Sequence, residues 1–330
     1  MGRKQQTKKE DALKRLSNDK TIRKHSEKKA MHIVHTDYYL GIKGENFHYM
    51  FSWQCGAPTS IRINGNEYLY RAPMPAFWRA STENDQGNGF PASSAVWFGA
   101  EMFTRIKSCM VYEITDGEEI CFNPQDFMTH TKASENITEI KICCTFEVSV
   151  VPLSELTVTY IIHGNGQILV KVNFPCSNIL PELPLLGMRF VMPELYEKYS
   201  WTGLSGETYP DRYKGAAFGT YTDKIEPTQY LVPQECKNHF QTHRLQVGGL
   251  EFVMDKMPFS CSVLPYTPVE LESALHQEEL PESTRTVVSI LGFMRGVGGI
   301  DSWGSDVEEK YQLTGGKKYS YSFYIRPANL

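Results

Sequence analysis

The sequence predicts an all-β protein, arranged as one large antiparallel β-sandwich. From about residue 105 onward, short runs of β-branched and aromatic residues are broken by Gly, Pro and Asn at intervals of about 10–15 residues, as in consecutive strands and turns. The 18 Tyr, 17 Phe and 5 Trp are residue types that favour strands. No long amphipathic helix alternates with these runs, which argues against a β/α barrel or a dinucleotide-binding fold.

Strand-like runs and turn signals follow one another along the chain. Gly164-Asn165-Gly166 predicts a hairpin turn, because Gly and Asn tolerate positive φ. Asn64-Gly65 gives the same signal between Ile61–Ile63 and Tyr68–Tyr70. Ala95–Phe103 is the one run of the body that predicts a helix, and its nearly all-round apolar surface suggests a buried one. The main predicted strands are Cys143–Val150, Leu156–Ile162, Ile168–Phe174, Leu185–Met192, Thr286–Phe293 and Tyr319–Ile325.

Charge divides the 330 residues into a basic extension, residues 1–30, and a folded domain, residues 31–330. The extension holds 11 Lys and Arg against 4 Asp and Glu and has few apolar residues, so it is expected to be disordered. It has no aromatic residue to stack on bases, and the rest of the chain is acidic, with 23 basic and 34 acidic residues. We therefore expect no nucleic-acid partner.

Apolar and cysteine patterns predict a cytoplasmic protein without a membrane partner. The N-terminus lacks the apolar core of a secretory signal, and runs such as Val287–Met294 are far shorter than the ~20 residues of a membrane helix. Eight cysteines include no C-x-x-C pair, and two of them are adjacent, Cys143 and Cys144. Neither a disulfide framework nor a metal site is expected.

Catalytic patterns are missing from the chain. A glycosidase needs two converging carboxyl groups, yet the adjacent pairs Glu278/Glu279 and Glu308/Glu309 would point to opposite faces of a strand. Asp301/Asp306 is the remaining candidate pair, and loop carboxylates are usually solvated. The nine His residues show no zinc-binding spacing, and no G-x-S-x-G or G-x-G-x-x-G motif is in a suitable context. We therefore predict no catalytic residue.

Two polar loops rich in Gly and bearing Trp stand out, Pro75–Gly89 and Arg295–Gly304. Clustered Gly lets the backbone turn sharply, and a Trp held there offers a flat apolar face and one N–H donor. This combination suits a sugar-binding platform. The plainer alternative is that the loops are tight turns whose Trp residues close one end of the sandwich.

Four motifs occur in order along the chain, at Asn64–Glu67, Phe77–Gly87, Glu207–Arg212 and Arg295–Gly304. They match the patterns N-G-x-E, F-W-R-A-P-T-D-N-D-x-G, E-x-Y-x-D-R and R-G-x-G-G-x-D-S-W-G. With these motifs the chain resembles the small subunit of two-subunit bacterial β-galactosidases and the C-terminal β domain of the large single-chain enzymes. Ser81 departs from the family pattern by replacing a Pro, which frees the loop slightly, and Glu83 replaces an Asp.

This resemblance implies a galactose-mutarotase-like super-sandwich that completes the substrate site of a large subunit. In the family, the catalytic carboxylates of the retaining reaction and the magnesium ion lie in domains that this chain lacks. The resemblance therefore implies lactose hydrolysis by the assembled enzyme, with no catalytic residue, metal or cofactor in this chain and no activity of the chain alone.

The resemblance also assigns residues at the two loops. Trp303 is expected to bind the β-galactoside, with Asp301 capping the turn so that the indole projects outward. A mobile loop over the active site is expected at Gly87, Asn88, Gly89 and Phe90. Residues that brace the loops, without contacting substrate, are expected to be Arg79, Asp85, Glu207, Asp211, Arg212 and Asp301.

Two alternatives remain open from the sequence. In the first, the chain is a free-standing carbohydrate-binding or mutarotase-like β-sandwich. His163, His239 and His243 are then candidate proton donors, and their spacing in the sequence does not favour one of them. In the other it is a purely structural assembly subunit that never contacts substrate.

Overall fold

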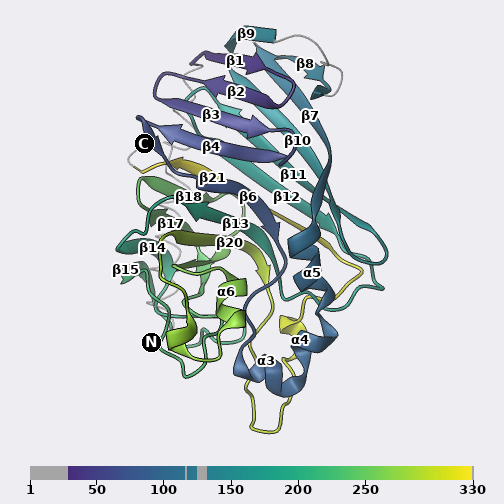
Figure 1. Cartoon of the computed structure of the whole chain (residues 1–330), viewed down its shortest axis with the longest axis vertical. Helices are drawn as coiled ribbons and strands as arrows, with labels where there is room; N and C mark the ends of the chain where they lie inside the picture. Colours follow the sequence, from purple (N-terminus) through teal and green to yellow (C-terminus); the bar gives the residue numbers. More distant parts are fainter. Residues whose placement is uncertain (1–28, 116, 125–131, 329–330) are drawn as a thin grey trace, which may run out of the picture.

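Three antiparallel sheets form the described part of the chain, which in this computed structural model covers residues 29–115, 117–124 and 132–328 (Figure 1). The predicted all-β antiparallel sandwich is confirmed. Strand β1 begins at Met31. The disordered extension predicted for residues 1–30 lies outside the described residues, except for residues 29 and 30.

The first sheet holds the N-terminal strands in the order β5-β4-β3-β2-β1-β9. Asn64 and Gly65, with φ values of 50° and 86°, form the predicted hairpin turn. The strand predicted at Tyr68–Tyr70 is wrong: the strand ends at Glu67, whose carboxylate accepts hydrogen bonds from the N–H groups of Tyr68 and Leu69. The strands are β1 (Met31–His35), β2 (Tyr39–Lys43), β3 (Phe47–Ser52), β4 (Ala57–Ile63), β5 (Asn66–Glu67) and β9 (Lys132–Ile137).

The largest sheet has ten strands in the order β15-β14-β17-β18-β21-β12-β11-β10-β7-β8. Its long strands alternate buried and partly exposed residues, because one face packs on the core. The predicted turn at Gly164–Gly166 joins β11 to β12, and Gly166 has a φ of 86°. The strands are β7 (Arg105–Thr115), β8 (Glu118–Phe122), β10 (Glu139–Val148), β11 (Ser154–His163), β12 (Ile168–Pro175), β14 (Lys198–Leu204), β15 (Phe218–Lys224), β17 (Arg244–Val247), β18 (Leu250–Met254) and β21 (Lys318–Pro327).

The third sheet, in the order β16-β19-β20-β13-β6, lies in the interior. Every residue of β13 and β19 is buried, so both faces are covered. Phe190 of β13 packs on Phe252 and Phe323 of the ten-stranded sheet, at ring-centroid distances of 5.1 and 6.3 Å. The strands are β6 (Arg71–Ala76), β13 (Leu185–Met192), β16 (His239–Thr242), β19 (Phe259–Leu264) and β20 (Thr286–Met294).

Short helices cluster where β6 leads out of the third sheet. The helix predicted at Ala95–Phe103 is confirmed as α5 (Val96–Phe103), but the expectation that it is buried is wrong, because Met102 and Phe103 in its last turn are exposed. The expectation of no other helix is also wrong. The loop predicted at Pro75–Gly89 contains α3 (Glu83–Asn88), which begins at a capping box of Thr82 and Asp85. The other short helices are α4 (Phe90–Ser93), α6 (Pro268–Ser273), η2 (Gln277–Glu279) and η3 (Glu309–Tyr311).

Candidate functional site

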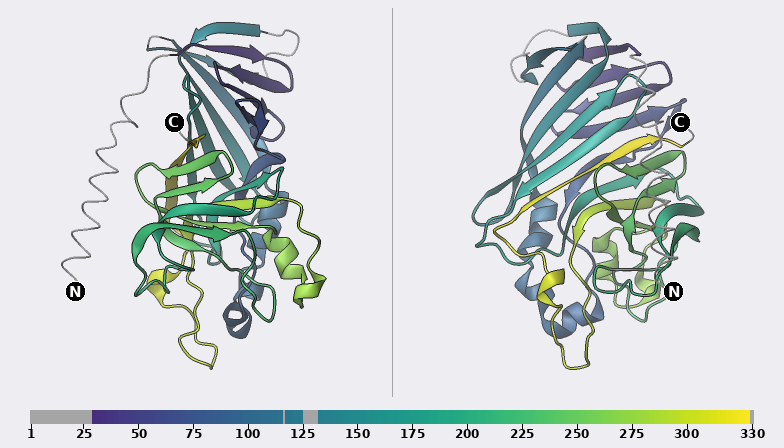
Figure 2. Two further views of the ribbon diagram at one scale, coloured as in Figure 1. Left: turned by 90° about the vertical axis from the view of Figure 1, so that its left-hand side faces the viewer. Right: turned by 180° about the vertical axis from the view of Figure 1, so that it is seen from behind.

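Both Gly- and Trp-bearing loops lie at the same end of the molecule. Helices α3 and α4 stand beside the segment that connects β20 to η3, and this segment projects beyond them (Figures 1 and 2). The two motifs are more than 200 residues apart in sequence, yet Asn84 of α3 donates from its side-chain amide to the carbonyl of Val297 at 3.2 Å. The sequence prediction that these loops form one site is thus supported by a direct contact.

Arg79 and Asp85 form a buried ion pair beneath α3. The guanidinium donates to both carboxylate oxygens, at 2.5 and 3.0 Å, and also to the carbonyl of Gly296 at 3.3 Å. Asp85 further accepts from the N–H and hydroxyl groups of Thr82, both at 2.9 Å. Burial alone would raise the pKa of Asp85, but the charge and hydrogen bonds of Arg79 outweigh burial and lower it. The ion pair is consistent with a bracing role for both residues, which stays a prediction.

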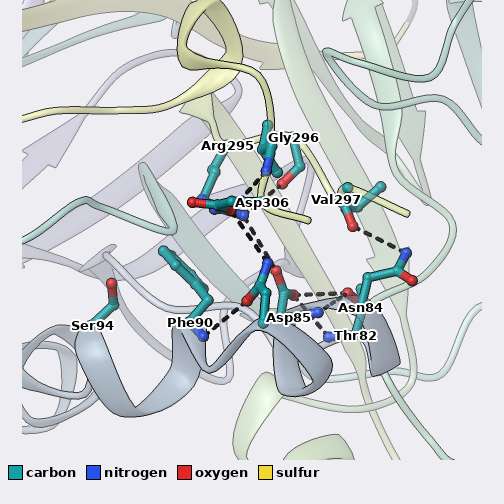
Figure 3. A network of polar contacts seen from close by, with 12 residues as sticks. Thr82, Asn84, Asp85, Phe90, Ser94, Arg295, Gly296, Val297 and Asp306 are labelled. Atoms are coloured by element: carbon teal, nitrogen blue, oxygen red, sulfur yellow. Dashed lines mark hydrogen bonds and ion pairs between the residues drawn. The ribbon is translucent and has the colours of Figure 1, made fainter. Parts of the chain in front are cut away.

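Arg295 is the centre of the network, a role that sequence reasoning missed (Figure 3). Its fully buried guanidinium binds Glu182 at 2.6 Å, Asp85 at 3.5 Å and Asp306. The same group lies over the ring of Phe90, 3.9 Å from its centroid. Arg295 therefore ties β20, α3, α4 and the projecting segment together.

Asp211 and Arg212 both form hydrogen bonds with the backbone of the Gly-rich segment. The Asp211 carboxylate accepts from the N–H groups of Val297, at 3.0 Å, and Gly298, at 2.9 Å. Arg212 donates from Nε to the carbonyl of Gly298 at 2.9 Å and from Nη2 to that of Gly299 at 3.0 Å. The two adjacent side chains thus satisfy donors and acceptors of one turn, which supports their predicted bracing role.

Close approach of side chains explains why this segment needs glycine. A Cβ on Gly296 would lie 2.6 Å from the carboxyl carbon of Asp211. A Cβ on Gly299, whose φ is +76°, would lie 2.4 Å from Nη2 of Arg212 and 2.6 Å from the side-chain nitrogen of Asn84. Any larger residue would push the bracing groups away from the backbone that they hold.

Trp303 projects from the tip of the segment, with 91% of its surface exposed. Asp301 accepts from the N–H groups of Trp303, at 2.9 Å, and Ser305, at 3.2 Å, and from the Ser305 hydroxyl at 2.5 Å. These hydrogen bonds lower the pKa of Asp301. The turn predicted from the sequence, capped by Asp301 and presenting the indole outward, is confirmed.

The segment Gly87–Phe90, predicted to be a mobile loop, spans a helix junction. Gly89, with a φ of 77°, ends α3 and precedes α4. A Cβ on Gly304 would lie 3.0 Å from the carbonyl oxygen of Gly87, so this junction directly adjoins the Trp303 turn. Its mobility stays a prediction, while its position beside the indole-bearing segment is clear.

Glu207 lines a neighbouring cavity. Its carboxylate accepts four hydrogen bonds, from the hydroxyls of Tyr209, Thr228 and Tyr230, each at 3.0 Å, and from the N–H of Lys237 at 2.9 Å. These four hydrogen bonds suit Glu207 to bracing more than to proton transfer, and its bracing role stays a prediction.

The cavity itself was not predicted. It has a volume of about 620 Å³ and opens beside α3 and Val297. Glu235 lines it and is 5% exposed. Burial raises the pKa of Glu235 to about 7, with Arg79 and Arg189 acting in the opposite direction. Residues 230–238 contain no recognisable motif, so the sequence alone does not indicate this site.

The three histidines considered from the sequence lie in different surroundings. His163 pairs with Glu139 at 3.0 Å, and His243 packs against Phe218. His239 lines the cavity, but its Nδ1 donates to the Gly206 carbonyl at 2.8 Å and its Nε2 lies 2.6 Å from the Tyr199 hydroxyl. Because burial also lowers its pKa to about 4, His239 is poorly suited to the proton-donor role of a mutarotase.

At least one member of each carboxyl pair considered for catalysis is engaged elsewhere, as Glu308 is with Lys310. Asp306 binds Arg295, Asp301 holds its own turn, and Glu279 binds His276 at 2.8 Å. In residues 29–115, 117–124 and 132–328, no cluster of three or more His, Cys, Asp or Glu side chains is arranged to hold a metal ion. Nor does this part of the chain contain a helix long and apolar enough to cross a membrane.

Comparison with known proteins identifies the family of the chain. The family model described as β-galactosidase small chain matches residues 43–325. The chain belongs to the β-galactosidase small-chain family. It is 42% identical to a β-galactosidase small subunit of Latilactobacillus sakei, over 90% of this chain and 98% of the relative.

Longer relatives and solved structures are also similar. The chain is 33% identical to a β-galactosidase of Lactobacillus delbrueckii subsp. bulgaricus and 31% identical to one of Halalkalibacterium halodurans, and it spans 28% of the length of each. Among solved structures, a putative aldose 1-epimerase of Escherichia coli covers 91% of the chain at 10% identity with a TM-score of 0.41. A galactose 1-epimerase of Lactobacillus acidophilus covers 88% at 6% identity with a TM-score of 0.43.

Proposed function

We propose that the chain is the small subunit of a two-subunit, lactose-hydrolysing β-galactosidase and completes the substrate site of a catalytic large subunit. The observation that carries this proposal is the exposed indole of Trp303, on a turn whose backbone is held by Asp211, Arg212 and Asp301. An apolar ring that is so exposed, on a turn held by several hydrogen bonds, is suited to contact a molecule outside this chain.

The chemistry belongs to the large subunit in this proposal. Retaining hydrolysis needs two carboxyl groups about 5–5.5 Å apart, one of them free to act as nucleophile. The carboxylates of Asp85, Asp211, Asp306 and Glu207 are instead bound to arginines, hydroxyls or backbone N–H groups. The small subunit is therefore inactive alone, and the magnesium ion is bound by the large subunit.

Trp303 acts on sugar binding more than on bond cleavage. The flat indole stacks on the C–H face of galactose or of the leaving sugar, while the Gly87–Phe90 junction closes beside it. Rigid bracing of the turn reduces the entropy lost when the ring becomes fixed against substrate. Eight cysteines without a disulfide among the described residues favour assembly in the cytoplasm.

Complementation tests this function. The purified chain is assayed for hydrolysis of a chromogenic β-galactoside, alone and after titration into a β-galactosidase large subunit. We expect no hydrolysis alone and activity that rises to saturation at a fixed ratio of subunits. Steady hydrolysis by the chain alone, or no gain in activity on mixing, would contradict the proposal.

A further inference from the structure

We propose that the cavity between α3 and the Glu207 cluster is a second carbohydrate site, which binds one neutral pyranose within this chain. Three observations lead to it: the size and lining of the cavity, the unpartnered carboxylate of Glu235, and the balance of charge around that carboxylate. The site is distinct from the Trp303 turn and does not require a large subunit.

The cavity has the size and chemistry of a small polar ligand site. Its volume of about 620 Å³ lies within the usual range of about 300–1,000 Å³ for ligand pockets. Tyr209 and Tyr230 contribute aromatic rings, Arg212, Lys237 and Gln234 contribute donors, and several carboxylates contribute acceptors. A pyranose offers the matching combination of apolar C–H faces and hydroxyls that both donate and accept.

Glu235 is the group that lacks a partner. Only 5% of its surface is exposed, yet no described residue donates a hydrogen bond to its carboxylate. The neighbouring Glu207, in contrast, has four donors. A carboxyl group that lines a cavity without a donor from the described residues can accept a hydrogen bond from a ligand hydroxyl.

Charge selects a neutral ligand over an ionic one. The lining holds four carboxylates, Glu83, Glu207, Asp223 and Glu235, against the two cations of Arg212 and Lys237, which disfavours an anion. Burial raises the pKa of Glu235 to about 7, so its carboxyl group is partly protonated near neutral pH and attracts a cation less than a full charge would. A hydroxyl donor satisfies the hydrogen-bonding capacity of Glu235 without adding charge.

Calorimetric titration of the full chain, in the absence of a large subunit, tests the proposal. The probes are D-galactose and D-glucose, with methylguanidinium as a cationic probe and inorganic phosphate as an anionic one. We expect saturable binding of at least one of the two sugars at millimolar concentration or below, with weaker binding of both ions. Absence of saturable sugar binding, or tighter binding of either ion, would overturn the proposal.

Variants locate the site. Glu235→Leu should weaken sugar binding by about tenfold to a hundredfold, which corresponds to the loss of a hydrogen bond to a charged group. Glu235→Gln, which keeps an acceptor and the side-chain volume, should have a smaller effect and guards against misfolding of the Leu variant. Glu282→Gln on the exposed surface should leave binding unchanged. Equal affinity in the native chain and in both Glu235 variants would contradict the assignment, whatever the outcome of complementation.

Discussion

The guanidinium of Arg295 lies 3.9 Å from the centroid of the Phe90 ring while its nitrogens bind three carboxylates. One side chain thereby positions the first residue of α4 against the start of the segment that carries Trp303. The planar guanidinium suits this position, because it can stack and bind several acceptors at once.

Replacing Arg295 by Lys should therefore destabilise the fold. A single ammonium group cannot reproduce the stacking and the three ion pairs, and Asp85 and Glu182 would be left underneutralised. We expect a loss of about 3–5 kcal/mol in the free energy of unfolding, measured by urea denaturation. Arg62→Lys, at an exposed position, is the matched control and should change stability by less than about 0.5 kcal/mol. Equal stability of the two variants would show that the network contributes little.

Gly299→Ala should perturb the Trp303 turn through a steric clash. The new Cβ would lie 2.4 Å from Nη2 of Arg212 in a backbone conformation with φ of +76°. Gly206→Ala is the control, since its φ is +70° and no atom lies within 4 Å of the added Cβ. The positive φ should lower the free energy of unfolding of both variants by about 1 kcal/mol or more, and Gly299→Ala should lose about 1–3 kcal/mol beyond that. Thermal melts of the two variants, compared with the native chain, measure the difference.

Acid sensitivity should follow from His239. Burial lowers its pKa from 6.5 to about 4, so between these two pH values the residue is protonated in the unfolded chain and neutral in the folded chain. Stability from this group is present above about pH 6.5 and is lost as the pH falls toward 4, by about 3 kcal/mol in total. His239→Gln should flatten the unfolding free energy across this window, whereas His32→Gln, at a partly exposed position, should not. A native-like slope in the His239 variant would exclude this residue as the cause.

Local chemistry explains which features could be read from the sequence. Asp301 and Trp303 act within a few residues of one another, so turn chemistry alone predicts both the cap and the outward indole. Strands such as Leu185–Met192 were predicted with their observed bounds, because a run in which all residues but Arg189 are apolar or small, set between turn signals, suits a strand buried on both faces.

Long-range contacts explain what the sequence could not show. Helix α3 has six residues, too few for an apolar period, and its capping box ends in Asp85 instead of the more familiar Glu or Gln. Arg295 meets Glu182 across 113 positions of the chain, and Glu235 reaches the cavity next to Glu207 from a run without any motif. Nothing in the periodicity of either segment indicates these partners.

Trp303 provides the most direct measurement of the central claim. Trp303→Ala should be assembled with a β-galactosidase large subunit at saturating small subunit, and KM and kcat for lactose compared with those of the native complex. Loss of one stacked ring costs about 1–3 kcal/mol, so we predict a KM about ten- to a hundredfold higher with a smaller change in kcat, and partial recovery in Trp303→Phe. Ile300→Ala, which removes another exposed apolar side chain from the same segment, should leave KM near its native value. An unchanged KM in the fully assembled Trp303→Ala complex would contradict the claim that this chain completes the substrate site.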